Sequence, residues 1–272
     1  MSSPSVRGPV ERFDRIWKGW ADQVPKEERI TQHRIGRARL LQALDDIAHR
    51  MPVNRILEVG CGSAIDLSLL SENPSGRVLI GLDISTTGLH VAEEFASHLG
   101  VRTRLCCGDV FALPFPASTF GLVFSQGLLE HFPDPTLVLQ EQVRVLAPGG
   151  YLAISVPQTF TGYTIQKRLA ILRGKWPWGW EGQFTSRRLT RLAQNHGLDL
   201  IHLFGEQYWL SWREPVWVLR DLFGKIHRRN PWRDKQPFAL IQTAHERLWN
   251  VIERRLGHLF MLNLVGIFRH PA

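Results

Sequence analysis

Glycines and carboxylates between residues 55 and 83 stand in an order that suits a nucleoside ligand. The apolar run Ile56 to Val59 is short and rich in β-branched residues, as in a strand buried on both faces of a parallel sheet. Gly60 and Gly62 then permit a tight turn whose backbone N–H groups face outward. A second apolar run ends at Asp83, 21 positions beyond Gly62, where nucleotide-binding βαβ units carry a ribose-binding carboxylate. The segment therefore predicts strand, turn, helix and strand around a nucleoside.

The glycine turn meets the dinucleotide-binding fingerprint only in part. Ile65 stands where that fingerprint has a third glycine, which lets the helix approach a pyrophosphate closely. Glu58 lies two residues before Gly60, and a carboxylate there repels phosphates but suits an ammonium group. We therefore expect a nucleoside without phosphates. The alternative is a helix-capping turn that binds no ligand.

These residues resemble motif I of the class I S-adenosylmethionine-dependent methyltransferases of the small-molecule type, in which an acidic residue precedes Gly-x-Gly. Asp83 is similar to that family's acidic residue at the end of the second strand. The resemblance implies S-adenosylmethionine as cofactor and S-adenosylhomocysteine as product. The cofactor-binding residues expected in this segment are Glu58, Gly60, Cys61, Gly62, Asp83 and Ile84.

Asp109 and Val110 follow the third predicted strand, Val101 to Cys107. In the sequences that this segment resembles, an acidic residue here accepts a hydrogen bond from the adenine amino group, and the amide of the next residue meets the ring. Asp109 could equally cap a turn at the strand end. The two upstream motifs favour the adenine role, so both residues are expected at the cofactor.

The fourth predicted strand, Phe120 to Phe124, leads into a second stretch of resemblance, FSQGLLEHFPDP. Ser125 and Gln126 lie where the carboxyl end of that strand opens, the edge at which ligands bind in open α/β sheets, so they are expected at the cofactor. His131 is the first candidate for a general base, and Glu130 is a weaker one. The alternative for His131 is a helix-terminal histidine bonded to nearby backbone.

The predicted elements together indicate a Rossmann-like, doubly wound α/β fold with a mostly parallel seven-stranded sheet. Apolar residues at helical spacing predict a helix from about Thr31 to His49. The turn at Pro148 to Gly150 resembles the family's turn before the fifth strand, and a last strand is expected near Leu262 to Phe268. The expected parts are an N-terminal helical segment (1–50), the cofactor-binding domain (51–204), a helical insertion (205–258) and the final strand (259–272).

Basic residues and tryptophans are concentrated in the second half of the chain. Residues 1–159 hold 15 Lys and Arg against 17 Asp and Glu, whereas residues 160–260 hold 17 against 8, together with eight of the ten tryptophans. In the insertion, apolar and basic residues recur at helical spacing on different sides. This pattern predicts a lid over an apolar acceptor, or contact with an anionic membrane through residues 205–235. The alternative is a subdomain packed on the sheet, whose basic face is merely solvated.

The expected reaction is in-line transfer of a methyl group to an oxygen, nitrogen or carbon atom of a small apolar or acidic metabolite. Such a displacement needs no metal, because the protein chiefly supplies proximity and orientation. A nucleic-acid-modifying methyltransferase is disfavoured despite the net charge of +8, since no Asn/Asp-Pro-Pro-aromatic motif follows the fourth strand. A non-catalytic protein of the same fold, acting at a membrane surface or on a partner, is the third alternative.

The three cysteines lack the paired spacing of a zinc site, and no segment reaches the roughly 18 apolar residues of a membrane span. No leader-like apolar region opens the sequence. A cytoplasmic protein, peripheral to the membrane through the insertion, is therefore expected, and the oligomeric state is left open.

Overall fold

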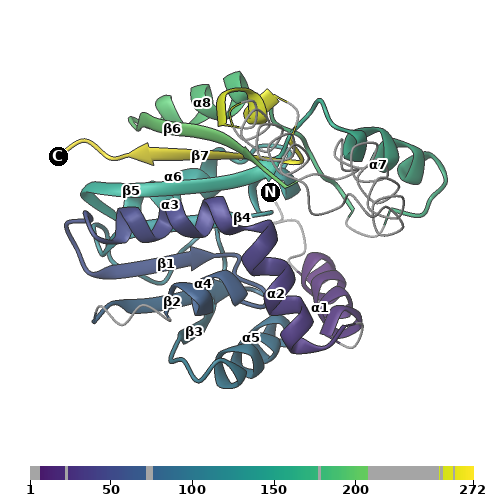
Figure 1. The fold of residues 1–272 in the computed structure, drawn as a ribbon, viewed down its shortest axis with the longest axis horizontal. Coiled ribbons are helices and arrows are strands. Elements are labelled where there is room, and N and C mark those ends of the chain that lie inside the picture. Colours follow the sequence, from purple (N-terminus) through teal and green to yellow (C-terminus); the bar gives the residue numbers. More distant parts are fainter. Residues whose placement is uncertain are drawn as a thin grey trace, which may run out of the picture.

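A seven-stranded sheet with helices on both faces forms the core of the protein (Figure 1). The computed structural model describes residues 7–21, 24–71, 76–176, 179–207, 251, 254–259 and 261–272. The strand order is β3-β2-β1-β4-β5-β7-β6, and β7 runs antiparallel to both of its neighbours. The strands are β1 (Arg55–Val59), β2 (Val78–Asp83), β3 (Arg104–Cys107), β4 (Phe120–Gln126), β5 (Leu146–Pro157), β6 (Asp199–Glu206) and β7 (Asn263–Arg269). This confirms the predicted doubly wound, mostly parallel sheet.

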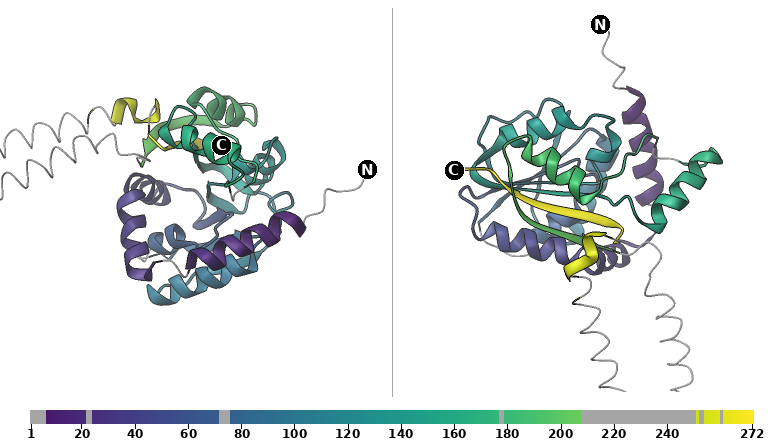
Figure 2. Two further views of the ribbon diagram at one scale, coloured as in Figure 1. Left: turned by 90° about the vertical axis from the view of Figure 1, so that its right-hand side faces the viewer. Right: turned by 90° about the horizontal axis from the view of Figure 1, so that it is seen from above.

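Among the described residues, three helices precede the sheet, and further helices follow β1, β2, β4 and β5. They are α1 (Arg7–Ala21), α2 (Lys26–Gly36), α3 (Ala38–Ala48), α4 (Ile65–Leu70), α5 (Thr86–His98), the 3-10 turn η1 (Leu129–His131), α6 (Thr136–Val145), α7 (Gly162–Leu172) and α8 (Ser186–Gln194). α1 packs along α5, and Figure 2 shows the two side by side. Ser85 caps α5 as expected, because its Oγ accepts from the N–H of Gly88 at 3.0 Å.

Burial on both faces explains why the central strands read as continuous apolar runs. Leu57 and Val59 belong to the core on the side of α6 and α8, whereas Ile56 belongs to the core on the side of α3, α4 and α5. Successive side chains of a strand point to opposite faces, so both sets must be apolar when both faces are covered.

The predicted single helix from Thr31 to His49 is wrong. The chain forms two helices instead, and Arg37 between them has φ −111° and ψ 14°. Gly36, a poor helix former, ends α2, and a Cβ at this position would meet the Gln207 side chain at 2.7 Å. The break turns Arg37 toward the end of β6, where it contacts Glu206.

The predicted turn at Pro148 to Gly150 lies inside β5 rather than before it. Phe120 pairs with Leu146 and Leu122 pairs with Tyr151, so the register shifts between the two pairs and β5 contains a bulge. Gly149 has φ +73°, which lets the bulged strand keep pairing on both sides. The apolar Leu146 therefore begins the strand.

The sequence analysis did not predict helix α7, which follows β5. The expected insertion, 205–258, lies mostly outside the described residues, and so do the helical pattern and the membrane-contact region 205–235 assigned to it. Those roles stay predictions. Within the described ranges, no helix is both long and apolar enough to cross a membrane.

Candidate active site

A cavity of about 620 Å³ opens at the carboxyl ends of β1, β2 and β4. It is bounded by α1 and α2 on one side and by η1, α7 and the segment before α8 on the other. Most of the predicted site residues line it: Glu58, Gly60, Cys61, Asp83, Ile84, Asp109, Val110, Gln126, Glu130 and His131. Gly62 and Ser125 do not.

The Asp83 carboxylate is held by backbone N–H groups of two loops. Its Oδ2 accepts from the N–H of Gly62 at 2.8 Å, and its Oδ1 accepts from the N–H of Ser85 at 2.8 Å. Burial raises the pKa of Asp83, although the N–H groups act in the opposite direction. The carboxylate is therefore fixed at the end of β2, on the wall of the cavity.

The space above Gly62 is occupied by helix α1. Gly62 has φ +48°, and a Cβ at this position would overlap the ring of Trp17. The same ring lies 3.0 Å from the position that a Cβ of Gly88 would take. Asp14, one turn earlier on α1, accepts from the Ser85 hydroxyl at 2.5 Å. Gly62 thus contributes through its N–H to Asp83 and by making room for Trp17.

Ser125 differs from its neighbour Gln126 because adjacent strand residues point to opposite faces. Ser125 is 1% exposed, and its Oγ has no hydrogen-bond partner in the described part of the chain. Gln126 instead reaches into the cavity.

Two carboxylates and an amide form the polar end of the cavity. The Gln126 Nε2 donates to Asp66 Oδ2 at 2.7 Å and to Glu58 Oε1 at 3.4 Å. Burial raises the pKa of Glu58 well above its ordinary value, and the nearby Asp66 charge adds to this. Burial acts on Asp66 in the same direction, but the hydrogen bond and charge of His33, with Arg37, outweigh it and lower the pKa of Asp66. Of these two carboxyl groups, Asp66 is therefore the more readily ionised.

Asp66, His33 and Arg37 were not among the predicted site residues. Asp66 lies in the first turn of helix α4, directly after the glycine turn. Its position beside a helix N-terminus could have identified it in the sequence as a candidate site residue. His33 lies on α2, and Arg37 lies at the break that follows it. Because one unbroken helix was predicted over these residues, they were not expected at the site.

Three buried polar atoms at this end have no partner among the described residues: Arg37 Nε, Glu58 Oε2 and Gln126 Oε1. Buried polar groups normally have partners, so these atoms indicate a ligand. A ligand with both an ammonium and a carboxylate would satisfy them, and the amino-acid part of S-adenosylmethionine has both. The residues present therefore fit this cofactor.

Asp109 takes the turn-capping role that was weighed as the alternative, and it also lies on the cavity wall. Its Oδ1 accepts from the N–H of Phe111 at 2.9 Å. Val110 is 8% exposed beside it and also lines the cavity. The expected adenine contacts of Asp109 and Val110 stay predictions.

His131 lies on η1 with its ring on the cavity wall. Its Nδ1 is 3.3 Å from the carbonyl oxygen of Trp180. Because a carbonyl only accepts, Nδ1 carries the hydrogen and Nε2 carries the lone pair. Burial lowers the pKa of His131, so the imidazole is neutral at neutral pH and able to accept a proton. The backbone bond considered for His131 therefore exists, but it goes to a residue 49 positions away.

Glu130 is buried beside it and differs from an ordinary carboxylate. Burial raises the pKa of Glu130 to about 8, so the group is mostly protonated at neutral pH. Its Oε2 has no hydrogen-bond partner in the ranges that the structure covers. Glu130 is thus better suited to donate a hydrogen bond than to remove a proton at neutral pH.

Aromatic rings form the other end of the cavity. They come from α1, from the loop after β3, from the segment after η1 and from the segment before α8: Phe13, Phe111, Phe132 and Trp180. Phe111 and Phe132 pack edge to face with centroids 5.1 Å apart, and Phe13 packs edge to face on His131 at 5.4 Å. Trp180 is 60% exposed. These rings offer an apolar surface beside the imidazole.

Among the residues that the structure describes, no group of three or more His, Cys, Asp or Glu side chains is arranged to hold a metal ion.

Comparison with known proteins agrees with this geometry. Residues 57–154 match the family described as a methyltransferase domain. A ubiquinone biosynthesis O-methyltransferase of Cupriavidus pinatubonensis is 27% identical over 212 residues, which cover 73% of this chain and 80% of the relative. A protein of the same name from Leptothrix cholodnii is 26% identical over 224 residues, which cover 74% and 90%.

Solved structures share the fold. A SAM-dependent methyltransferase from Thermotoga maritima aligns with a TM-score of 0.61 at 14% identity, covering 95% of this chain and 98% of that one. Magnesium protoporphyrin IX methyltransferase from Synechocystis PCC 6803, solved with bound SAH, aligns with a TM-score of 0.57 at 12% identity, covering 97% and 95%. Residues 57–154 thus match a methyltransferase domain, and the chain is similar in sequence, fold and cavity to the class I S-adenosylmethionine-dependent methyltransferases.

Proposed function

We propose that this methyltransferase acts on a hydroxyl oxygen of a small, largely apolar acceptor, with His131 as the general base. The observation that carries the proposal is the position of His131. Its neutral imidazole shares one cavity with the carboxylates of the polar end and contacts the aromatic end. The curated relatives named above are O-methyltransferases, which supports oxygen as the acceptor atom.

The polar end supports a defined orientation of the cofactor. Asp66 and Glu58 suit the ammonium, Arg37 suits the carboxylate, and Asp83 suits the ribose hydroxyls. When bound, S-adenosylmethionine supplies an electrophilic methyl group on a positively charged sulfur and leaves as S-adenosylhomocysteine. The aromatic end then holds the acceptor by burying its apolar surface.

His131 supplies the proton chemistry. The acceptor hydroxyl loses its proton as its oxygen forms the bond to carbon, and Nε2 takes that proton. The bond from Nδ1–H to the Trp180 carbonyl holds the ring and strengthens when the imidazole becomes charged. Holding the two reactants in line can lower the barrier by about 7 to 11 kcal/mol.

The test measures S-adenosylhomocysteine formation with acceptors that share one aromatic ring and differ in a single group: hydroxyl, amine or carboxylate. We expect turnover with the hydroxyl. His131→Asn should lower kcat by roughly 10² to 10⁴-fold, the usual contribution of a general base, while calorimetry shows unchanged affinity for S-adenosylhomocysteine. His90→Asn is the matched control, because His90 is exposed and its Nδ1 also lies near a backbone carbonyl. Turnover of the amine or carboxylate alone, or an unchanged kcat in His131→Asn, contradicts the proposal.

The chain is also proposed to contact anionic membranes peripherally. The excess of basic residues in 160–260 supports this. So does α7, whose Ile165 and Leu172 are 65% and 83% exposed beside the exposed Arg168 and Arg173. We expect flotation with vesicles containing an anionic phospholipid, lost at high salt and absent with zwitterionic vesicles. Equal flotation with both vesicle types, or none with either, contradicts this contact.

A further inference from the structure

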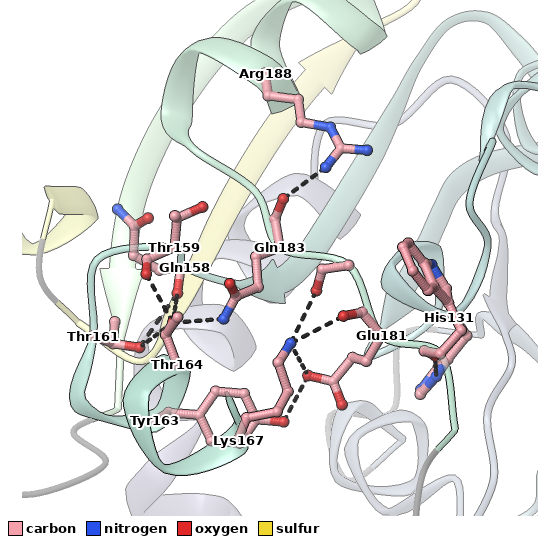
Figure 3. A network of polar contacts seen from close by, with 12 residues as sticks. His131, Gln158, Thr159, Thr161, Tyr163, Thr164, Lys167, Glu181, Gln183 and Arg188 are labelled. Carbon is pink, nitrogen blue, oxygen red and sulfur yellow. Dashed lines mark hydrogen bonds and ion pairs between the residues drawn. The ribbon is translucent and has the colours of Figure 1, made fainter. Parts of the chain in front are cut away.

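A buried ion pair lies behind His131 and joins α7 to the segment that precedes α8 (Figure 3). The Lys167 Nζ donates to Glu181 Oε1 at 3.1 Å, to the Glu181 carbonyl at 3.0 Å and to the Gly182 carbonyl at 3.4 Å. Both side chains are 4% exposed. Lys167 thus holds the backbone and the side chain of this segment at the same time.

The same short segment is bonded to η1 on its other side. The N–H of Gly182 donates to the carbonyl oxygen of Glu130 at 2.6 Å. The Trp180 carbonyl accepts from His131 Nδ1 at 3.3 Å. Residues 180–182 therefore connect the ion pair directly to Glu130 and to His131, the proposed base.

Tyr163 strengthens the connection from the cavity wall. Its hydroxyl donates to Glu181 Oε1 at 2.7 Å, so this oxygen receives two donors. Further along, Gln183 Nε2 donates to Thr164 Oγ1 at 2.5 Å, which fastens the same two segments a second time (Figure 3).

We propose that Lys167 and Glu181 are positioning residues for methyl transfer, which fix the Trp180 carbonyl and thereby set the tautomer and direction of the His131 ring. The inference rests on the proposed role of His131 and names the residues that hold it. Replacing a buried ion pair with apolar residues of similar volume is often neutral for stability. The effect of this pair is therefore sought in the geometry of His131.

The charges around His131 make the proposed positioning role testable through the pKa of its imidazole. The charged groups that face His131 are Glu181, which raises its pKa, and Lys167 and Arg12 of α1, which lower it; Glu130 adjoins it on η1. Removing the charge of Lys167 should therefore raise the pKa of His131, and removing that of Glu181 should lower it. Simple loosening of the site would move both variants in the same direction, toward the ordinary value of histidine.

The experiment follows the imidazole nitrogens of His131 by NMR against pH in the full chain, in Lys167→Met and in Glu181→Gln. We expect pKa changes of opposite sign in the two variants, and loss of the single Nδ1–H tautomer in both. Shifts of the same sign, or none, overturn the inference.

Kinetics supplies the second readout. In both variants kcat should fall about tenfold or more, as expected when a general base is misplaced, whereas the affinity for S-adenosylhomocysteine stays within about twofold because the cofactor end is separate. Arg168→Met is the matched control, since this neighbouring cation on α7 is exposed. If Lys167→Met does not fold, Tyr163→Phe keeps the ion pair, removes one donor to Glu181, and should lower kcat several-fold.

The outcomes separate this inference from the proposed function. If His131→Asn keeps full activity, the proposed base is wrong, and the NMR titration still decides whether the ion pair sets the state of the ring. If His131→Asn loses activity while Lys167→Met and Glu181→Gln keep wild-type kcat and an unshifted His131, the proposed function stands and the positioning role is refuted.

Discussion

The polar end of the cavity takes three side chains from the strands and the others from α2, the break after it and α4, whereas the rings of the other end come only from the segments around the sheet. At the polar end, Glu58, Asp83 and Gln126 belong to adjacent parallel strands, and the register Glu58 to Gly81 and Glu58 to Phe124 fixes their spacing. At the aromatic end, the rings come from α1, from two loops and from the segment after α7. No strand register determines how these rings meet.

This difference shows how one fold keeps a cofactor and varies an acceptor. Moving Glu58, Asp83 or Gln126 means shifting a strand, which would turn its whole set of apolar side chains to the wrong face. A residue of the aromatic end can change without disturbing the sheet, because loops carry specificity on a rigid scaffold. The two ends should therefore respond separately to substitution.

Asp83→Ala should have the largest effect on cofactor binding. The substitution removes a fixed carboxylate and leaves the Gly62 and Ser85 amides without their acceptor. We expect about 3 kcal/mol weaker binding of S-adenosylhomocysteine, or roughly 100-fold, by calorimetry. Asp109→Ala is the control, with a loss of about tenfold or less. Equal losses of affinity in both variants would contradict a specific role for Asp83 in binding the cofactor.

Glu130→Gln should stabilise the protein, and increasingly so as the pH rises. The folded pKa of about 8 lies above the ordinary 4.5. The stability of the wild type is therefore full below about pH 4.5 and declines as the pH rises toward 8, because the unfolded chain releases this proton first. Urea unfolding should show a gain of about 5 kcal/mol at pH 9 and almost none at pH 4. A gain independent of pH would contradict a buried, protonated Glu130.

Cofactor affinity should rise with pH because Glu58 becomes ionised. Its raised pKa leaves it neutral at low pH, and an ammonium ligand favours the ionised form. Glu58→Gln should remove this pH dependence and weaken binding at alkaline pH by about tenfold, or 1.4 kcal/mol. Calorimetry with S-adenosylhomocysteine from pH 6 to 9 provides the measurement. A parallel pH dependence in Glu58→Gln would assign it to another group.

Trp180→Ala should have the smallest effect, confined to the acceptor. The indole is 60% exposed, so its loss removes part of an apolar surface and leaves the backbone carbonyl at His131 in place. We expect the acceptor KM to rise about fivefold, for roughly 1 kcal/mol of lost burial, with kcat unchanged. Phe160→Ala is the control, because this ring is 70% exposed and outside the cavity lining. A change in cofactor affinity would break the separation of the two ends.

Residues on the strands could be predicted from the sequence more readily than residues on the surrounding segments. Glu58, Asp83 and Gln126 were found because strand periodicity places strand ends at one edge, and that edge binds ligands. Ser125 was expected with them but points away, since alternation along β4 separates it from Gln126. Gly62 was predicted as a cofactor contact, yet a ring from α1, 45 positions earlier, fills the space above it.

No comparable pattern in the sequence identifies the residues of the aromatic end or of the ion pair. Lys167 and Glu181 are 14 positions apart, on a helix that was not predicted and in the segment that follows it, and nothing in their local pattern says that they meet. Arg37 was hidden because the helix around it was expected to be unbroken. Contacts of this kind depend on how whole elements pack, which short-range periodicity does not encode.

The pairing of β6 with β7 bears on how the length of the segment between them could be changed. Glu206 pairs with Asn263, and the next step outward is joined by the Leu262 N–H to the Gln207 carbonyl at 2.9 Å and by the Asn263 amide to the Gln207 side chain at 2.9 Å. The chain thus leaves and rejoins the sheet at a single point. Changing the number of residues between Gln207 and Leu262 would change the closure entropy only logarithmically, by about 0.6 kcal/mol per doubling, so the register of β6 and β7 does not depend on one fixed length between them.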